Sequence, residues 1–221
     1  NWKITGCPVN GPAISTKANS VAIAWFTVAD NLPSVKVVFS NNNGETFNEP
    51  IGIGDVAPLG RVDIEMLEDN SALVSWMDTV EGKTSIKLQR VYKSGKLSSV
   101  TTLAESSESR SRCFPRMVVK DNLAYITWTK VNEGNKLSIE TANINTDLID
   151  HVILIEGIVE DINDLNHRNT VILKGKDTKR FVICDMQKSE NLALLNVGDT
   201  VTIKGILKGT LKDVILLNCI I

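Results

Sequence analysis

The stretch Ser71-Ala-Leu-Val-Ser-Trp76 decides how the first part of this chain folds, because two other stretches repeat it. Ser20-Val-Ala-Ile-Ala-Trp25 precedes it and Asn122-Leu-Ala-Tyr-Ile-Thr-Trp128 follows it, so the three tryptophans lie 51 and 52 residues apart. Alternate residues of a strand point to opposite faces, and here both faces are apolar. Strand-rich repeats of about 40–50 residues are typical of β-propeller blades, in which neighbouring blades cover both faces of each sheet.

Each repeat places a short segment and a polar turn before its tryptophan strand. The short segments are residues 12–15, 61–64 and 115–118, which in a propeller line the central channel. A further turn follows at a constant distance, since Gly44 and Gly95 each lie 19 residues after a tryptophan. This spacing predicts about three propeller blades over residues 1–146. Tyr125 lies inside the third tryptophan strand, so we expect it in the core.

The pattern changes after the polar turn at residues 143–147. Residues 148–221 contain five strand-like runs, at 151–159, 170–174, 180–184, 200–207 and 213–221. Ser189 precedes an apolar segment in which Leu192 and Leu195 are three apart, which predicts a short helix between the third and fourth strands. Five strands with a helix in this place are the plan of an OB-fold barrel. Gly157 and Gly205, inside the first and fourth strands, suit the sharp coiling that closes a small barrel.

The fold class is therefore all-β: a partial β-propeller followed by a five-stranded OB-fold barrel. The charges are balanced in the propeller half, with 15 basic and 15 acidic residues in 1–146, and residues 147–221 carry 9 basic and 11 acidic residues. Single-stranded nucleic acid prefers a basic groove with stacking aromatics. The barrel half has one aromatic apart from its histidines, Phe181, so the sequence argues against nucleic acid as a partner. No apolar run approaches the roughly 20 residues of a membrane span.

Four cysteines lie far apart in the sequence, at positions 7, 113, 184 and 219. None forms a Cys-x-x-Cys pair, so we expect no zinc site and no other metal or cofactor. Cys184 and Cys219 both fall in predicted strands of the barrel. They are either a disulfide, if the protein is exported, or two small buried residues.

The octet Ser40-Asn-Asn-Asn-Gly-Glu-Thr-Phe47 resembles the Asp-box, also called the BNR repeat, of bacterial neuraminidases. The Asp-box pattern is Ser-x-Asp-x-Gly-x-Thr-Trp, so Asn42 replaces the Asp and Phe47 replaces the Trp. The residues suit a hairpin turn, because the Ser40 and Asn42 side chains can accept hydrogen bonds from the turn backbone and Gly44 can adopt a positive φ. Thr46 completes the motif. By this resemblance, residues 1–145 are similar to sialidase-like propeller proteins.

The resemblance implies a ligand site as well as a fold. Sialidases hold the carboxylate of their substrate with three arginines, since a guanidinium pairs in two places with a planar anion. Arg61 and Arg116 begin the inner segments of successive blades, Arg112 lies just upstream of Arg116, and Asp63 is a carboxylate close to Arg61. We find no match for the family's first arginine or its acid/base aspartate, so the catalytic residues stay unknown and an enzymatic activity stays open.

The barrel half has a resemblance of its own. Residues 197–205, Val-Gly-Asp-Thr-Val-Thr-Ile-Lys-Gly, and residues 213–219, Asp-Val-Ile-Leu-Leu-Asn-Cys, are similar to the tRNA-anticodon-like OB family of exported bacterial proteins. This likeness spans nearly all of residues 150–221.

Three functions follow as hypotheses. In the first, the chain is part of an exported sialidase-like propeller protein, periplasmic or extracellular. That protein binds or hydrolyses an acidic glycan, or binds another anion, and the OB module is an accessory. The second is a non-catalytic interaction or scaffold protein. The third is binding of single-stranded nucleic acid by the OB domain. Because propellers have about four to eight blades, an incomplete ring exposes apolar blade faces, through which two copies could pair as a homodimer.

Overall fold

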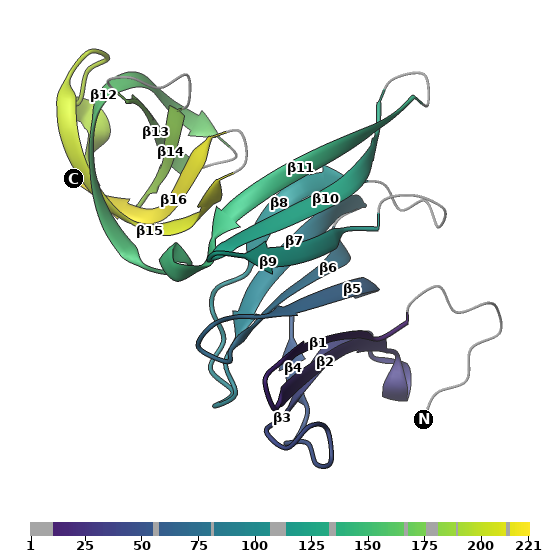
Figure 1. Ribbon diagram of the computed structural model, residues 1–221. Helices are drawn as coiled ribbons and strands as arrows, with labels where there is room; N and C mark the ends of the chain where they lie inside the picture. The colour runs from purple at the N-terminus through teal and green to yellow at the C-terminus, as the bar shows by residue number, and fades with distance from the viewer. Residues whose placement is uncertain are drawn as a thin grey trace. The chain divides into compact units, whose positions relative to one another are not determined.

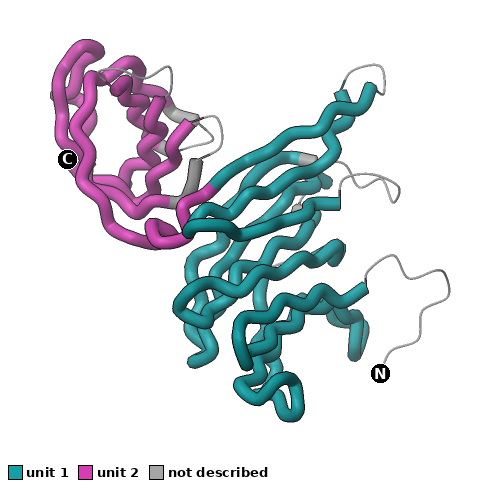
Figure 2. The backbone as a smooth tube through the Cα atoms, in the orientation of Figure 1, with its two compact units in different colours: residues 1–143 teal, residues 144–221 magenta. Residues whose placement is uncertain are grey.

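Strands dominate the computed structural model, which describes residues 11–54, 58–80, 82–106, 114–132, 136–165, 168–175, 181–188, 190–210 and 213–221. The chain divides into two compact units, residues 1–143 and 144–221 (Figure 2). The first unit contains successive antiparallel sheets and the second a closed barrel (Figure 1). These findings confirm the predicted fold class, which is all-β with a partial propeller followed by a five-stranded barrel.

Three sheets correspond to the three sequence repeats, and we name them blades 1, 2 and 3. The strands of blade 1 are β1 (Ala13–Lys17), β2 (Ser20–Thr27), β3 (Ser34–Ser40) and β4 (Ile51–Ile53). Those of blade 2 are β5 (Pro58–Met66), β6 (Ala72–Val80), β7 (Lys83–Val91) and β8 (Thr101–Ser106). Those of blade 3 are β9 (Arg116–Lys120), β10 (Leu123–Val131) and β11 (Leu137–Asn145). In each sheet, strands that follow one another in sequence are also neighbours.

Blades 1 and 2 share one apolar core. Ala22 and Ala24 of β2 belong to the same buried cluster as Val74 and Trp76 of β6, and all four are fully buried. Trp76 is the largest of these side chains, so its burial removes much apolar surface from water and stabilises the contact. The first two tryptophan strands, β2 and β6, thus supply the packing between blades 1 and 2 that their apolar faces predict.

Polar contacts also join neighbouring blades along their first strands. The Ser15 hydroxyl of β1 donates to a Glu65 carboxylate oxygen of β5 at 3.0 Å, and it accepts from the Met66 N–H at 3.0 Å. Lys17 forms an ion pair with Glu68 at the ends of the same two strands. The first strands of blades 1 and 2 therefore lie side by side.

Blade 3 differs from blade 2 in how its faces are covered. Ala124, Ile126 and Trp128 of β10 are buried, whereas the intervening Tyr125 is 45% exposed and Ile139 of β11 is 78% exposed. The expectation that Tyr125 lies in the core is therefore wrong. Its face of the sheet has the apolar residues of an inter-blade surface, but the described residues leave it partly exposed.

The barrel strands are β12 (Val152–Leu165), β13 (Arg168–Lys174), β14 (Phe181–Met186), β15 (Thr200–Thr210) and β16 (Val214–Ile220), closed in the order β12-β13-β14-β16-β15. β14 and β16 are parallel, and the other pairs are antiparallel. A Cβ atom on Gly205 would lie 2.6 Å from the Cys219 sulfur. Glycine is therefore required where β15 coils closely against β16.

Within the described residues, helical structure is limited to single 3₁₀ turns. These are η1 (Ala29–Asn31), η3 (Thr146–Leu148) and η4 (Leu192–Leu194). The short helix expected between the third and fourth barrel strands is η4, and its cap is Asn191, whose side chain accepts from the Ala193 N–H at 3.1 Å. The predicted cap, Ser189, lies outside the described residues. In the described part of the chain, no helix has the length and apolarity to cross a bilayer.

Candidate anion-binding site

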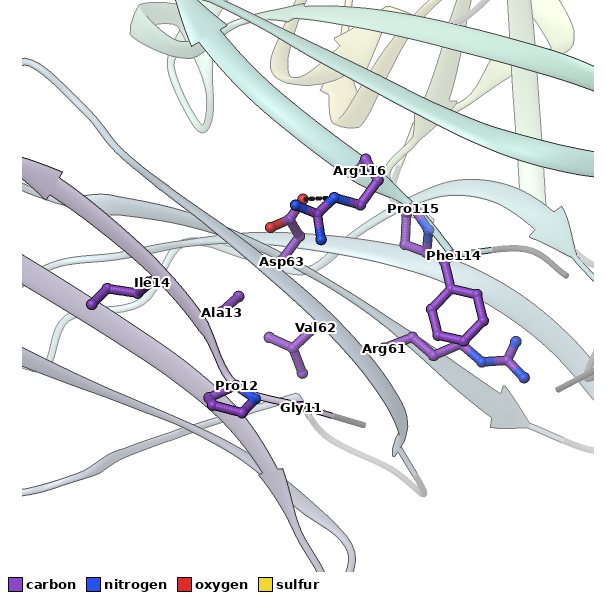
Figure 3. A pocket seen from close by; sticks show the side chains of 10 residues that line it. All are labelled: Gly11, Pro12, Ala13, Ile14, Arg61, Val62, Asp63, Phe114, Pro115 and Arg116. Atoms are coloured by element: carbon purple, nitrogen blue, oxygen red, sulfur yellow. Dashed lines mark ion pairs between the residues drawn. The ribbon is translucent and has the colours of Figure 1, made fainter. Parts of the chain in front are cut away.

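A pocket of about 490 Å³ opens where the beginnings of β1, β5 and β9 meet. Its lining includes Arg61 and Asp63 from β5 and Arg116 from β9, three of the four residues that the sequence predicts for an anion site (Figure 3). The fourth, Arg112, lies outside the described residues. Pockets of this size hold small-molecule ligands in other proteins.

A β-bulge shapes the floor of this pocket. Gly60 and Arg61 both have a positive φ, of 88° and 54°, and the pairing of β5 with β6 shifts register around them. For a residue with a side chain this conformation is strained. Bulges redirect the side chains that follow them. Here the bulge separates the directions of Arg61 and Asp63, which are only two residues apart.

Arg61 does not point at Asp63 or Arg116. Its side chain extends away from both and lies along the Phe114 ring (Figure 3), with the guanidinium carbon 5.0 Å from the ring centre. One guanidinium nitrogen donates to the Met77 sulfur at 3.3 Å, and the residue is only 6% exposed. The two arginines thus share a pocket but do not converge on one point.

Asp63 is fixed by the backbone around it. One carboxylate oxygen accepts from the Ile64 N–H at 3.1 Å, and the other accepts from the Met117 N–H at 2.8 Å. The second bond crosses from blade 2 to blade 3. A buried carboxylate held in this way is a rigid part of the pocket wall.

Arg116 is the accessible cation of the pocket. Its Nε lies 3.4 Å from an Asp63 carboxylate oxygen, and 74% of its side-chain surface is exposed. A single long ion pair at such exposure contributes little to stability. The guanidinium therefore keeps most of its donors available to an incoming carboxylate.

Glu65 lies near the pocket but does not line it. Burial raises the pKa of its carboxyl group above the ordinary value, the hydrogen bond from Ser15 acts in the opposite direction, and the charge of Asp63 raises it further. Glycoside hydrolysis usually needs two carboxyl groups about 5–10 Å apart around the substrate. Asp63 is the one carboxylate among the pocket-lining residues that the structure describes.

Sequence reasoning missed Phe114 as a part of the pocket, whereas Pro12 belongs to the segment 12–15 that the sequence places along the channel. Phe114 is 38% exposed and directly precedes the inner segment 115–118. An aromatic residue immediately before an inner strand is the signal that could have identified it, because exposed aromatics in pockets commonly contact ligands.

The Asp-box-like turn lies away from this pocket, between β3 and β4. The Ser40 hydroxyl accepts from the Gly44 N–H at 2.9 Å, and the side-chain Oδ1 of Asn42 accepts from the Thr46 N–H at 3.0 Å. Gly44 has a φ of 86°, and a Cβ there would be 3.7 Å from the Phe47 ring. These side chains hold the backbone of the turn in its conformation.

Cys184 and Cys219 are free, buried thiols in the barrel core. A hydrogen bond with Cys219, together with burial, raises the pKa of the Cys184 thiol. In the pairing of β14 with β16, Cys184 is opposite Leu216 and Cys219 is opposite Met186, so the two are not direct cross-strand partners. A disulfide between them stays a prediction. Among the residues that the structure covers, no group of His, Cys, Asp and Glu could hold a metal ion.

The fold thus defines an all-β protein with partial propeller blades and an OB-like barrel. Residues 134–221 match the family model described as tRNA_anti-like, which confirms the predicted OB-like module. No curated protein matches the chain.

Several solved glycoside hydrolases resemble the structure. A xylan β-1,4-xylosidase from Bacillus halodurans C-125 matches 60% of this chain with 27% of its own, at 14% identity and a TM-score of 0.42. The GH43B protein of a Bacteroides ovatus xyloglucan locus matches 96% of this chain with 44% of its own, at 11% identity and a TM-score of 0.42. A GH43 endo-arabinanase from Bacillus licheniformis matches 89% of this chain with 72% of its own, at 11% identity and a TM-score of 0.37. The chain thus spans less than half the length of the first two, and likeness at this level decides neither substrate nor activity.

Proposed function

We propose that the propeller half binds an acidic glycan, through a sugar carboxylate that pairs with Arg116. The observation that carries this proposal is the combination, in one pocket, of a mostly exposed guanidinium with a rigid wall. Two arginines and one aspartate give the lining a net positive formal charge, which favours an anion. The resemblance of residues 1–145 to sialidase-like propellers supports a sugar acid as that anion. It also supports export of the protein.

Binding is proposed rather than hydrolysis, because the described lining offers a single carboxylate. Asp63 is already engaged by two backbone N–H groups and by Arg116, so it is suited to orienting Arg116 rather than to transferring protons. By orienting the Arg116 side chain before the ligand arrives, Asp63 reduces the conformational entropy that Arg116 loses on binding, and this improves affinity.

The test is a titration of the 221-residue chain with methyl glucuronoside and with the methyl ester of the same sugar, followed by NMR or calorimetry. A single charge-assisted contact predicts a Kd of about 1 mM for the acid and much weaker binding of the ester. Arg116→Ala should weaken the acid about ten-fold, and added salt should weaken it further.

Lys120→Ala is the matched control, because it removes one exposed positive charge from the same strand without touching the pocket. It should bind as the wild type does. Equal binding of acid and ester, or unchanged binding by Arg116→Ala, would contradict the proposal.

A further inference from the structure

Phe114 presents an exposed aromatic surface to the pocket. The ring lines the pocket and is 38% exposed, although it is a large apolar side chain next to two charged groups. One side of the ring faces the Arg61 guanidinium, as Figure 3 shows, at 5.0 Å from the ring centre. The exposed part of Phe114 is therefore available to a ligand in the pocket.

Arg61 has the properties of a support for this ring. It is 6% exposed, its guanidinium donates to the Met77 sulfur, and its backbone is held at a φ of 54°. A cation placed over an aromatic face makes a cation–π interaction with the ring, and burial strengthens that interaction. Because the Arg61 guanidinium is engaged by Met77 and the Phe114 ring, it is in a poor position to bind a ligand next to Arg116. It holds the Phe114 ring in place instead.

We propose that Phe114 is the specificity-determining residue of the pocket: its ring packs against the apolar C–H face of a sugar ring whose carboxylate pairs with Arg116, while Arg61 is a positioning residue that holds Phe114. The substrate class is then a carboxylated pyranose rather than a small free carboxylate. This inference rests on the proposed function, since it assigns Arg116 the same role.

The chemistry of the two contacts explains the selectivity. Arg116 recognises a carboxylate wherever it occurs, so on its own it binds acetate and a sugar acid alike. A pyranose presents axial C–H groups on a ring face, and covering that face with an aromatic ring removes apolar surface of both the sugar and the protein from water. A small carboxylate has no such face and gains nothing from Phe114.

The experiment compares methyl glucuronoside with propionate as ligands of the full chain. We expect the wild type to bind the glucuronoside about ten-fold more tightly than propionate. Phe114→Ala should reduce that ratio to about two and leave propionate affinity unchanged, whereas Phe114→Trp should preserve the ratio. Tyr125→Ala is the matched control, because it removes an aromatic residue of similar exposure from blade 3 outside the pocket.

Arg61→Gly tests the positioning role without backbone strain, since glycine adopts a φ of 54° freely. It should lower the glucuronoside-to-propionate ratio several-fold while propionate still binds. If Phe114→Ala and Arg61→Gly leave the ratio unchanged while Arg116→Ala abolishes binding, the selectivity inference is wrong and the proposed function stands. If Arg116→Ala changes nothing, both are wrong.

Discussion

Blades 2 and 3 carry the same sequence repeat but differ in how they are covered. In blade 2, Leu73 and Trp76 point to opposite faces of β6, and both are fully buried. In blade 3, Trp128 is 3% exposed and Tyr125, on the other face, is 45% exposed. The repeat therefore determines which side chains form each face, whereas a neighbouring blade determines whether a face is buried. Mutations at equivalent positions should have very different costs in the two blades.

The largest difference should come from truncating one aromatic residue in each blade. Trp76→Ala removes a fully buried side chain and leaves a cavity, so it should lower the free energy of unfolding by about 3–5 kcal/mol. Tyr125→Ala, at an exposed position, should change it by about 0.5 kcal/mol or less. Urea denaturation followed by tryptophan fluorescence and circular dichroism measures both. A comparable loss in Tyr125→Ala would mean that this face is covered in solution.

A smaller effect should come from the contact that joins the two blades. Asp63→Ala leaves the buried Met117 N–H without its acceptor at 2.8 Å, which should cost about 1–3 kcal/mol. Asp63→Asn retains an oxygen acceptor and should lose clearly less. Denaturation of the two variants under identical conditions gives the comparison, and equal losses would show that charge rather than the hydrogen bond matters.

The smallest effect should appear in the pH dependence of stability at Glu65, where blade 2 meets blade 1. Because burial raises the pKa of this carboxyl group in the folded state, the fold favours the protonated form. Its contribution is fully present below the ordinary value of 4.5 and is lost as the pH rises through the raised value. Glu65→Gln cannot titrate, so its stability should lack this decline between pH 4.5 and neutrality. If the stability of the wild type and of Glu65→Gln changes in parallel with pH, the raised pKa of Glu65 is refuted.

The sequence alone predicted the features of the fold that follow from the spacing of repeated residues. Trp25, Trp76 and Trp128 identified the blades, because a strand repeat of fixed length has few architectures that bury it. The last four barrel strands were also predicted close to their observed bounds, since alternating apolar residues bounded by glycine and polar turns leave few alternatives. The first was predicted to end at residue 159, whereas β12 continues to Leu165.

The features that depend on neighbours or on local backbone were missed. Tyr125 was expected in the core, because a strand pattern shows which residues are apolar but not whether another sheet packs on them. Arg61 was expected to point at an anion together with Arg116. Its direction is set by the bulge at Gly60, and two consecutive positive φ values in the middle of a strand leave no periodic signal.

The close contact of Gly205 with the Cys219 sulfur links the evolution of two positions in the barrel. A Cβ atom at position 205 would meet that sulfur at 2.6 Å and Leu216 Cβ at 3.1 Å, so Gly205→Ala alone is blocked by sterics. A change of Cys219 to a smaller residue opens the space first and makes the second change permissible. Among related barrels, alanine at position 205 should therefore occur together with alanine or glycine at position 219, with the change at 219 coming first.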